Sequence, residues 1–528
     1  MRLIALLTVL FCSGAAAQPP RTSPPPRPRG SGGVRLEGPL LRVPSKFAGN
    51  VPKQPRIAVV FNTHLDPVGA PNLEARRAEL ERRRENMLWL QGVVEAIDPA
   101  KRPKLNIQMT GGHAEFFLKD ERGFQMIRRF YEQGHSIGTH FHRNTYLGSY
   151  LDWGELRPTQ PLRKPELAPD EILTPGIMVL LGGRPEPNTM DEERRLWKDN
   201  FRFTEPLIAK VTGLTDKEAI RRINNHGEFH LPRSMAWKDI LFKEFGITVQ
   251  TGGRNELFLM IFDHDVHNAW RPDAKDALGE DVNNRAYVCV PQVAVPGNIK
   301  PHQDVMQDLS VPAMKRRFLQ ILMERSEHER LGLPPKTWTF GWTVHDFDIY
   351  PADATRGPNR SQRKNVQELV AWINDNFVPD VAYWDTPNGV ANSFYELEAR
   401  QPGVPQFHYA SRKRDWDAYP YRMKGAARAL IGSHFVRALK DWSGIQAFEL
   451  ERVKPDSEWY TDPNNEVKVK GATSRLVLAW SDAGSRTIDV SRFAAGNVKV
   501  IRGTSGEIST AKAAAVPVGT EPVIVEVE

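Results

Sequence analysis

Cysteine is scarce in this chain of 528 residues, which contains only two, Cys12 and Cys289. Cys12 falls in an N-terminal segment that we expect to be removed, and Cys289 then has no partner for an intrachain disulfide. A chain of this length can instead bury enough apolar surface for two or three domains. The stability of the mature fold is therefore expected to come from core packing.

Long apolar runs and blocks of one charge are also missing. Beyond the N-terminus, no segment reaches the roughly 18 uninterrupted apolar residues of a membrane helix. The formal net charge of +7 is mild for this size, and no run of Lys and Arg marks a nucleic-acid-binding stripe. No G-x-G-x-x-G or G-x-x-x-x-G-K-[ST] motif opens a predicted helix, and no solenoid-type repeat is present. These absences argue against a transmembrane span, a nucleic-acid partner and a nucleotide-binding sheet.

The first residues have the pattern of a secretory signal peptide. An apolar stretch from Leu3 to Phe11 follows a charged start, and small residues end at Ala17. This pattern predicts cleavage before Gln18 and export, so that the mature protein is secreted or periplasmic. A lipoprotein attached at Cys12 is the alternative, and the bulky Phe11 before that cysteine argues against it.

Three further regions differ in composition. Residues 18–54 begin with a Pro-rich stretch that has almost no apolar side chains, which predicts an extended tether. Residues 55–445 alternate between strand and helix patterns. From about Ala472 onward, short β runs are separated by Gly, Ser and Asp turns, so residues 446–528 are predicted to form a small antiparallel, sandwich-like β domain.

The alternating region indicates an α/β barrel. Residues 56–61 form a continuous apolar run, as expected for a strand that is buried on both faces. Strand, helix and strand patterns follow at 105–109, 123–133 and 135–141, and the alternation recurs at 237–249, 288–295, 338–344 and 366–384. Short links imply parallel pairing through right-handed crossovers. We predict one barrel with an insertion at about 154–217.

His and Asp residues follow three of the predicted strands. The candidates are His64 and Asp66 after the first strand, His140 and His142 at the third, and His345 and Asp346 at the late strand. Catalytic groups of α/β barrels collect at the carboxyl ends of the strands, so these side chains are expected to converge. Imidazole nitrogens and a carboxylate oxygen suit a divalent cation such as zinc, with an open position for water.

The histidines of the third strand have different expected roles. His140 and His142 are two residues apart on an extended segment, so both point to one side and could reach the same ion. The alternative is that one of them is an ordinary core or surface histidine, which the company of His64 and Asp66 makes less favoured. His135 is at odd spacing from His140 and is predicted to be structural.

Residues 109–142 read MTGGHAEFFLKDERGFQMIRRFYEQGHSIGTHFH. This segment resembles the strand, helix and G-H-E-I-G-x-H motif of the polysaccharide deacetylases, a family of carbohydrate esterases that includes chitooligosaccharide deacetylases. The resemblance places His140 on the first metal-binding histidine of the motif. The second family ligand corresponds to Asn144, so that role stays with Asn144 or passes to His142.

Other family landmarks are present in altered form. The T-F-D-D-G of the family's first strand supplies a base and a metal-binding aspartate, and it corresponds to residues 61–64, which contain no aspartate. His64 and Asp66 are the substitutes. Residues 230–233 stand where the family has R-x-P-Y, which implies substrate-binding roles for His230 and Arg233. The alternatives for Arg233 are that it orients Asp66 or that it is a solvated surface arginine.

The late strand carries the last landmark. Val344-His345-Asp346 resembles the late H-D motif, whose histidine acts as general acid. The resemblance covers about residues 56–398 and implies a distorted deacetylase-type barrel. It also implies a metal-dependent hydrolase that removes acetyl groups from an N- or O-acetylated polysaccharide. A carbohydrate polymer or oligosaccharide is therefore the expected partner.

The same resemblance implies catalytic roles. Asp66 would take the proton of a metal-activated water, unless it is itself a ligand. His345 would protonate the leaving amine, with Asp346 or Asp348 fixing its tautomer.

Two alternative functions stay open. A glycoside hydrolase on a related barrel would use Asp66 and Asp346 as its pair of carboxyl groups. A non-catalytic glycan-binding or envelope protein is favoured by Asn62 and Thr63, which stand where the family has its paired aspartates.

Overall fold

The computed structural model describes residues 53–66, 68, 73–141, 190–228, 235–251, 267–272, 280–291, 311–351, 361–404, 430, 433–453, 458–461, 467–470, 473–481, 484–503 and 506–527. These residues all belong to the second of two compact units, Lys46–Glu528. The predicted signal peptide, nearly all of the predicted tether and residues 154–189 of the predicted insertion lie outside the described residues. Among the residues that the structure describes, no helix has the length and apolar character that a membrane crossing requires.

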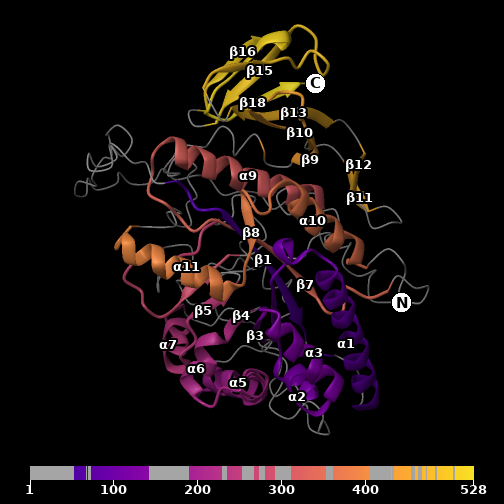
Figure 1. The fold of residues 1–528 in the computed structure, drawn as a ribbon, viewed down its shortest axis with the longest axis vertical. Coiled ribbons are helices and arrows are strands. Elements are labelled where there is room, and N and C mark those ends of the chain that lie inside the picture. Colours follow the sequence, from indigo (N-terminus) through magenta and orange to yellow (C-terminus); the bar gives the residue numbers. More distant parts are fainter. Residues whose placement is uncertain are drawn as a thin grey trace, which may run out of the picture. The chain divides into compact units, whose positions relative to one another are not determined.

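A curled parallel sheet with flanking helices forms the larger part of the fold (Figure 1). Its strands are β1 (Ile57–Leu65), β2 (Leu105–Met109), β3 (Ser136–Phe141), β4 (Asn225–Glu228), β5 (Val249–Thr251), β6 (Val288–Val290), β7 (Thr339–His345) and β8 (Ala382–Trp384). The strand order is β6-β5-β4-β3-β2-β1-β7, and β8 pairs with the start of β1. The predicted α/β barrel-like fold is confirmed.

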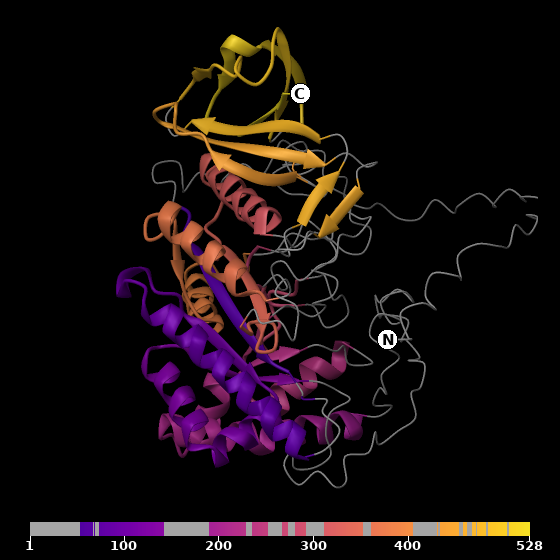
Figure 2. The same cartoon turned by 90° about the vertical axis from the view of Figure 1, so that its right-hand side faces the viewer.

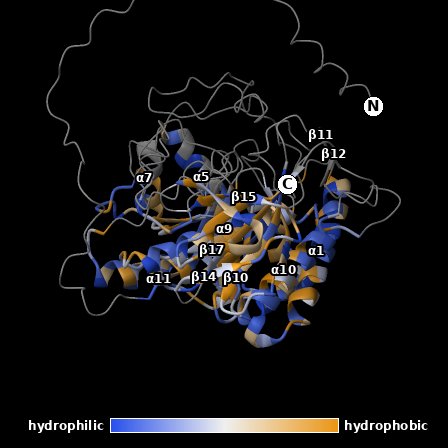
Figure 3. Ribbon diagram, turned by 90° about the horizontal axis from the view of Figure 1, so that it is seen from above, coloured by the Kyte–Doolittle hydropathy of each residue, from blue (hydrophilic) through white to orange (hydrophobic). Residues whose placement is uncertain are grey.

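The helices of this part follow the strands in the chain. They are α1 (Leu73–Glu95), α2 (Gly111–Lys119), α3 (Glu121–Glu132), α5 (Met190–Thr212), α6 (Lys217–Ile223), α7 (Met235–Phe245), α9 (Val311–Arg330), α10 (Arg363–Asn376) and α11 (Pro387–Arg400). Polar and apolar residues are mixed along α10 and α11 (Figure 3), as expected for helices with one face on a core. In α10 the buried apolar face contains Val366, Leu369, Val370 and Ile373.

Strand β1 is longer than its apolar run suggests. The run ends at Phe61, but the strand continues to Leu65 with every residue buried. The added residues pair with β2 on one side and with β7 on the other. Asn62 keeps a hydrogen bond inside the sheet, because its Oδ1 accepts from Asn106 Nδ2 at 2.7 Å. Backbone pairing with both neighbouring strands therefore keeps this polar segment in the sheet.

Two helical segments were not read correctly from the sequence. Helix α2 lies between β2 and α3, where only one helix, at 123–133, was predicted. Helix α3 itself begins after Asp120, whose carboxylate accepts from the Gly123 N–H at 2.7 Å. Helix α5, within the predicted insertion, packs on α2 and β3 and belongs to the helical layer of the barrel.

An antiparallel β domain follows the barrel, as predicted (Figure 2). Its elements are β9 (Ser433–Ala438), β10 (Ile445–Val453), β11 (Glu458–Thr461), β12 (Val467–Lys470), β13 (Thr473–Ser481), β14 (Arg486–Ile488), β15 (Asn497–Arg502), β16 (Ile508–Lys512), β17 (Val516–Val518) and β18 (Val523–Val527). The main sheet has the order β16-β15-β18-β13-β10-β9. Strands β9 and β10 precede Ala472, where the β pattern of the sequence becomes clear.

His135, just before β3, makes a structural hydrogen bond. It is 3% exposed, and its Nδ1 accepts from the Leu105 N–H at 2.8 Å. Burial lowers the pKa of His135 to about 3, and the nearby Lys104 and Arg102 charges act in the same direction. The imidazole is therefore neutral in the folded protein at neutral pH.

We predict that His135 makes the fold sensitive to acid. In the unfolded chain its pKa returns toward 6.5. Between that value and about 3 the unfolded state binds the extra proton, so the free energy of unfolding decreases as the pH falls. The slope from this one group is at most about 1.4 kcal/mol per pH unit. In His135→Gln this contribution is absent. The free energy of unfolding, measured with urea from pH 7 to pH 4, should therefore decrease less steeply than in the wild type. Parallel curves for the two proteins would contradict this assignment.

Candidate active site

The carboxyl ends of three parallel strands carry the candidate histidines. His64 lies near the end of β1, His140 near the end of β3, and His345 at the end of β7. His64 is in register with His345 across the β1–β7 pair. Because parallel strands end at a common edge, these side chains meet there although they are far apart in the sequence.

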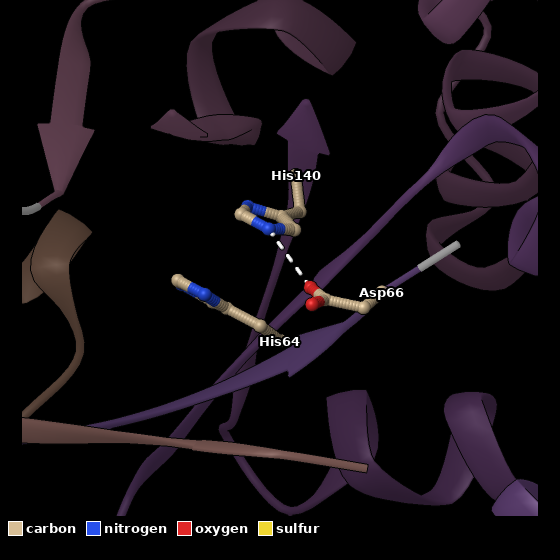
Figure 4. Close-up of side chains that lie close together, drawn as sticks. All are labelled: His64, Asp66 and His140. Carbon is tan, nitrogen blue, oxygen red and sulfur yellow. Dashed lines mark ion pairs between the residues drawn. The ribbon is translucent and has the colours of Figure 1, made fainter. Parts of the chain in front are cut away.

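His64, Asp66 and His140 form a cluster that can hold a metal ion. Each offers one ligand atom, and these atoms lie within 4.8 Å of one another. His140 Nε2 is 3.0 Å from Asp66 Oδ1, and the two imidazole rings stack with centroids 4.0 Å apart. Figure 4 shows the Asp66 carboxylate facing the His140 ring, with the His64 ring close by. Two imidazoles and a carboxylate fit a divalent ion of borderline softness and leave a coordination position for water.

His345 stands beside this cluster with a carboxylate on each of its nitrogens. Its Nδ1 is 2.9 Å from Asp348 Oδ2, and its Nε2 is 3.8 Å from Asp66 Oδ2. Burial lowers the pKa of His345, but the Asp66 and Asp348 carboxylates outweigh it and raise the pKa to about 9. The side chain of His345 is 19% exposed and is therefore partly open to solvent. This arrangement suits a proton donor.

Asp346 has a different environment from its neighbours in the sequence. Its side chain is fully buried, with Oδ1 3.2 Å from Arg83 Nη1 and Oδ2 3.0 Å from His113 Nε2. Its N–H donates to the His64 carbonyl at 3.0 Å. The hydrogen bond that orients the His345 ring comes from Asp348, which the sequence left as one of two choices. Asp346 instead joins the ends of β1 and β7.

The structure brings together His64, Asp66, His140 and His345. The Asp346 side chain lies apart from them, and four further predicted site residues lie outside the described residues: His142, Asn144, His230 and Arg233. Arg83 and His113 were missed from the sequence, although both contact Asp346. Arg83 stands in a run of three arginines in α1, and nothing in the spacing sets it apart from Arg82 or Arg84.

The sequence matches no protein-family model and no curated protein sequence. Several solved structures show weak similarity to the chain. The 4-alpha-glucanotransferase from Thermococcus litoralis is 8% identical with a TM-score of 0.34, and the alignment covers 89% of this chain and 99% of that one. Agd3, a carbohydrate deacetylase, is 11% identical with a TM-score of 0.31, covering 89% of this chain and 65% of that one.

A third structure, a β-L-arabinopyranosidase from Geobacillus stearothermophilus in complex with arabinose, is 8% identical with a TM-score of 0.26, covering 90% of this chain and 97% of that one. These similarities are weak. The fold assigned to the chain therefore rests on its own strand pairing.

We predict that the purified protein binds one divalent ion per chain at the cluster. His64→Ala and His140→Ala should each reduce the metal content to background, because two protein ligands hold an ion poorly. Elemental mass spectrometry after exposure to zinc, cobalt or nickel measures this. His328→Gln is the control, since His328 is also buried but its Nε2 lies 3.0 Å from the Pro334 carbonyl. Full metal content in His140→Ala would exclude the cluster as the binding site.

Proposed function

We propose that the chain is a zinc-dependent hydrolase that removes acetyl groups from an N- or O-acetylated polysaccharide. The observation that carries the proposal is the pairing of a three-ligand cluster with a separate proton donor at the same edge of the sheet. The cluster is His64, Asp66 and His140, and the donor is His345. The motif resemblance of residues 109–142 supports an acetylated carbohydrate as the substrate class.

The side chains divide the chemistry between them. A divalent ion held by the cluster would polarise the acyl carbonyl and lower the pKa of a bound water toward about 7. We assign Asp66 as a ligand through Oδ1, which lies beside His140. Asp66 Oδ2 lies 3.8 Å from His345 Nε2, on the side of the ring that carries the proton to be donated. His345 donates that proton to the leaving nitrogen or oxygen, while Asp348 holds the opposite ring nitrogen.

The glycosidase alternative is less well supported by the geometry. Its pair would be Asp66 and Asp346, and both must reach the scissile bond. Asp346 is fully buried, and its two oxygens contact Arg83 and His113. These contacts favour a structural role for Asp346.

The non-catalytic alternative rested on the missing aspartates. Asn62 and Thr63 are buried within β1, where Asn62 bonds Asn106 and Thr63 Oγ1 donates to the Asn106 carbonyl at 3.3 Å. The residues that converge with His140 lie further along the chain, at His64 and Asp66. Compared with the family motif, the candidate ligands lie further along the chain, at the end of β1 and just beyond it, which supports a working site.

Acetate release from acetylated oligosaccharides tests the proposal. His345→Gln should lower kcat about 10²- to 10⁴-fold, because the general acid is removed. Its metal content should stay at the wild-type level, since His345 is outside the ligand cluster. Chelation should abolish activity in the wild type, and added zinc should restore it.

The controls separate the three functions. His328→Gln should keep wild-type kcat. Cleavage of glycosidic bonds that survives chelation would contradict the proposal in favour of a glycosidase. Saturable sugar binding without turnover, by a protein that carries its full metal content, would contradict it in favour of a binding protein.

We also propose that the protein acts outside the cytoplasm. The exported form should begin at Gln18, as measured by intact-mass analysis of the secreted or periplasmic fraction. Leu6→Arg places a charge in the apolar stretch and should leave the precursor uncut in the cytoplasm. A lipid-modified mass that is lost in Cys12→Ala would show a lipoprotein instead.

A further inference from the structure

We infer that Arg83 is a positioning residue that fixes Asp66 and His345 relative to each other. The inference rests on the proposed function, because it concerns how that site holds its ligand and its acid. Arg83 belongs to α1 and reaches the ligand Asp66 through the backbone carbonyl of that residue. Arg83 acts on the site through the backbone of Asp66 and through the side chains of Asp346 and Phe347.

The guanidinium of Arg83 joins the two chain segments that leave β1 and β7. Arg83 Nη1 donates to the Asp66 carbonyl at 2.6 Å and to Asp346 Oδ1 at 3.2 Å. Asp346 in turn donates its N–H to the His64 carbonyl at 3.0 Å, and Asn86 Nδ2 donates to the Asp346 carbonyl at 2.8 Å. One cation thus contacts the backbone that follows β1 and a side chain that follows β7.

The flat face of Arg83 reaches the acid side of the site. Its guanidinium carbon lies 5.1 Å from the centroid of the Phe347 ring. That ring stacks on the His345 ring, with centroids 4.8 Å apart and planes 7° from parallel. The Phe347 ring therefore contacts both Arg83 and the proton donor. A shift of the guanidinium would let Phe347, and with it His345, change position.

These contacts need a guanidinium rather than any cation. Arg83 Nε donates to Glu79 Oε1 at 3.0 Å while Nη1 serves Asp66 and Asp346. A planar fork can satisfy these directions together and still lie over a ring, whereas the single ammonium of lysine cannot. Arg83 is 7% exposed, so water is poorly placed to replace the lost contacts.

Arg83→Lys is compared with Arg84→Lys, a matched control in the same helix. Arg84 is also 7% exposed and bonds a carboxylate, Asp120 Oδ2 at 2.7 Å, away from the cluster. Zinc affinity is measured on the full chain by competition with a chromogenic chelator. We expect Arg83→Lys to weaken zinc binding about 10- to 100-fold, the usual effect of a lost supporting contact around a metal ligand. Arg84→Lys should bind zinc as the wild type does.

Two readouts distinguish positioning from loss of folding. Cobalt bound in place of zinc reports ligand geometry through its visible spectrum, which should change in Arg83→Lys and not in Arg84→Lys. In Arg83→Ala, guanidinium ion at a non-denaturing concentration should restore much of the zinc affinity, whereas an unfolded variant would not recover.

The outcomes for this inference and for the proposed function are separate. Equal zinc affinity and equal cobalt spectra in wild type and Arg83→Lys would overturn the role of Arg83 and leave the hydrolase proposal standing. A wild type that binds neither zinc nor cobalt would overturn the proposed function, and the role of Arg83 with it.

Discussion

Strand β1 is hydrogen-bonded in parallel along both of its edges, and the candidate site depends on this pairing. Residues 61–65 pair with β2 while residues 58–64 pair with β7. The ladder sets His64 beside His345, and β2 then positions β3 so that His140 ends at the same edge. Local structure alone cannot bring these three residues together, because each belongs to a separate strand. The sheet is therefore the scaffold of the site as well as the core of the fold.

The polar interior of the sheet is tolerated because its amides bond one another. Asn225 Nδ2 donates to Asn106 Oδ1 at 2.8 Å, and Gln108 Nε2 donates to Asn225 Oδ1 at 2.7 Å. A buried amide without a partner costs on the order of 1–3 kcal/mol, so each of these bonds removes a substantial penalty. Gly138 leaves the necessary space, since a Cβ there would lie 2.3 Å from Asn225 Oδ1. The network gives the strands a defined register beneath the histidines.

The fold could be predicted from the sequence more completely than the site. Apolar runs mark the strands, and the face of α3 is visible from Phe124 and Ile127, because burial leaves a periodic pattern. The same pattern fails at the end of β1, where buried residues are polar and only their neighbours keep them in the sheet. The role of Arg83 could not be predicted from the sequence for a related reason. A buried arginine and an exposed one look alike in a helix, and the carboxylate that distinguishes Arg83, Asp346, is distant in the sequence.

The candidate ligands differ in how firmly the sheet holds them, and this difference explains why a contact from Arg83 matters. His64 and His140 lie on strands and are 3% and 0% exposed, so the backbone ladder and close packing fix their rings. Asp66 follows the last residue of β1 and its side chain is 14% exposed, so the ladder does not hold it. A ligand beyond the end of a strand loses more conformational freedom when it binds, unless other contacts have already ordered it. The Arg83 bond to the Asp66 carbonyl supplies such a contact at the point where the ladder stops.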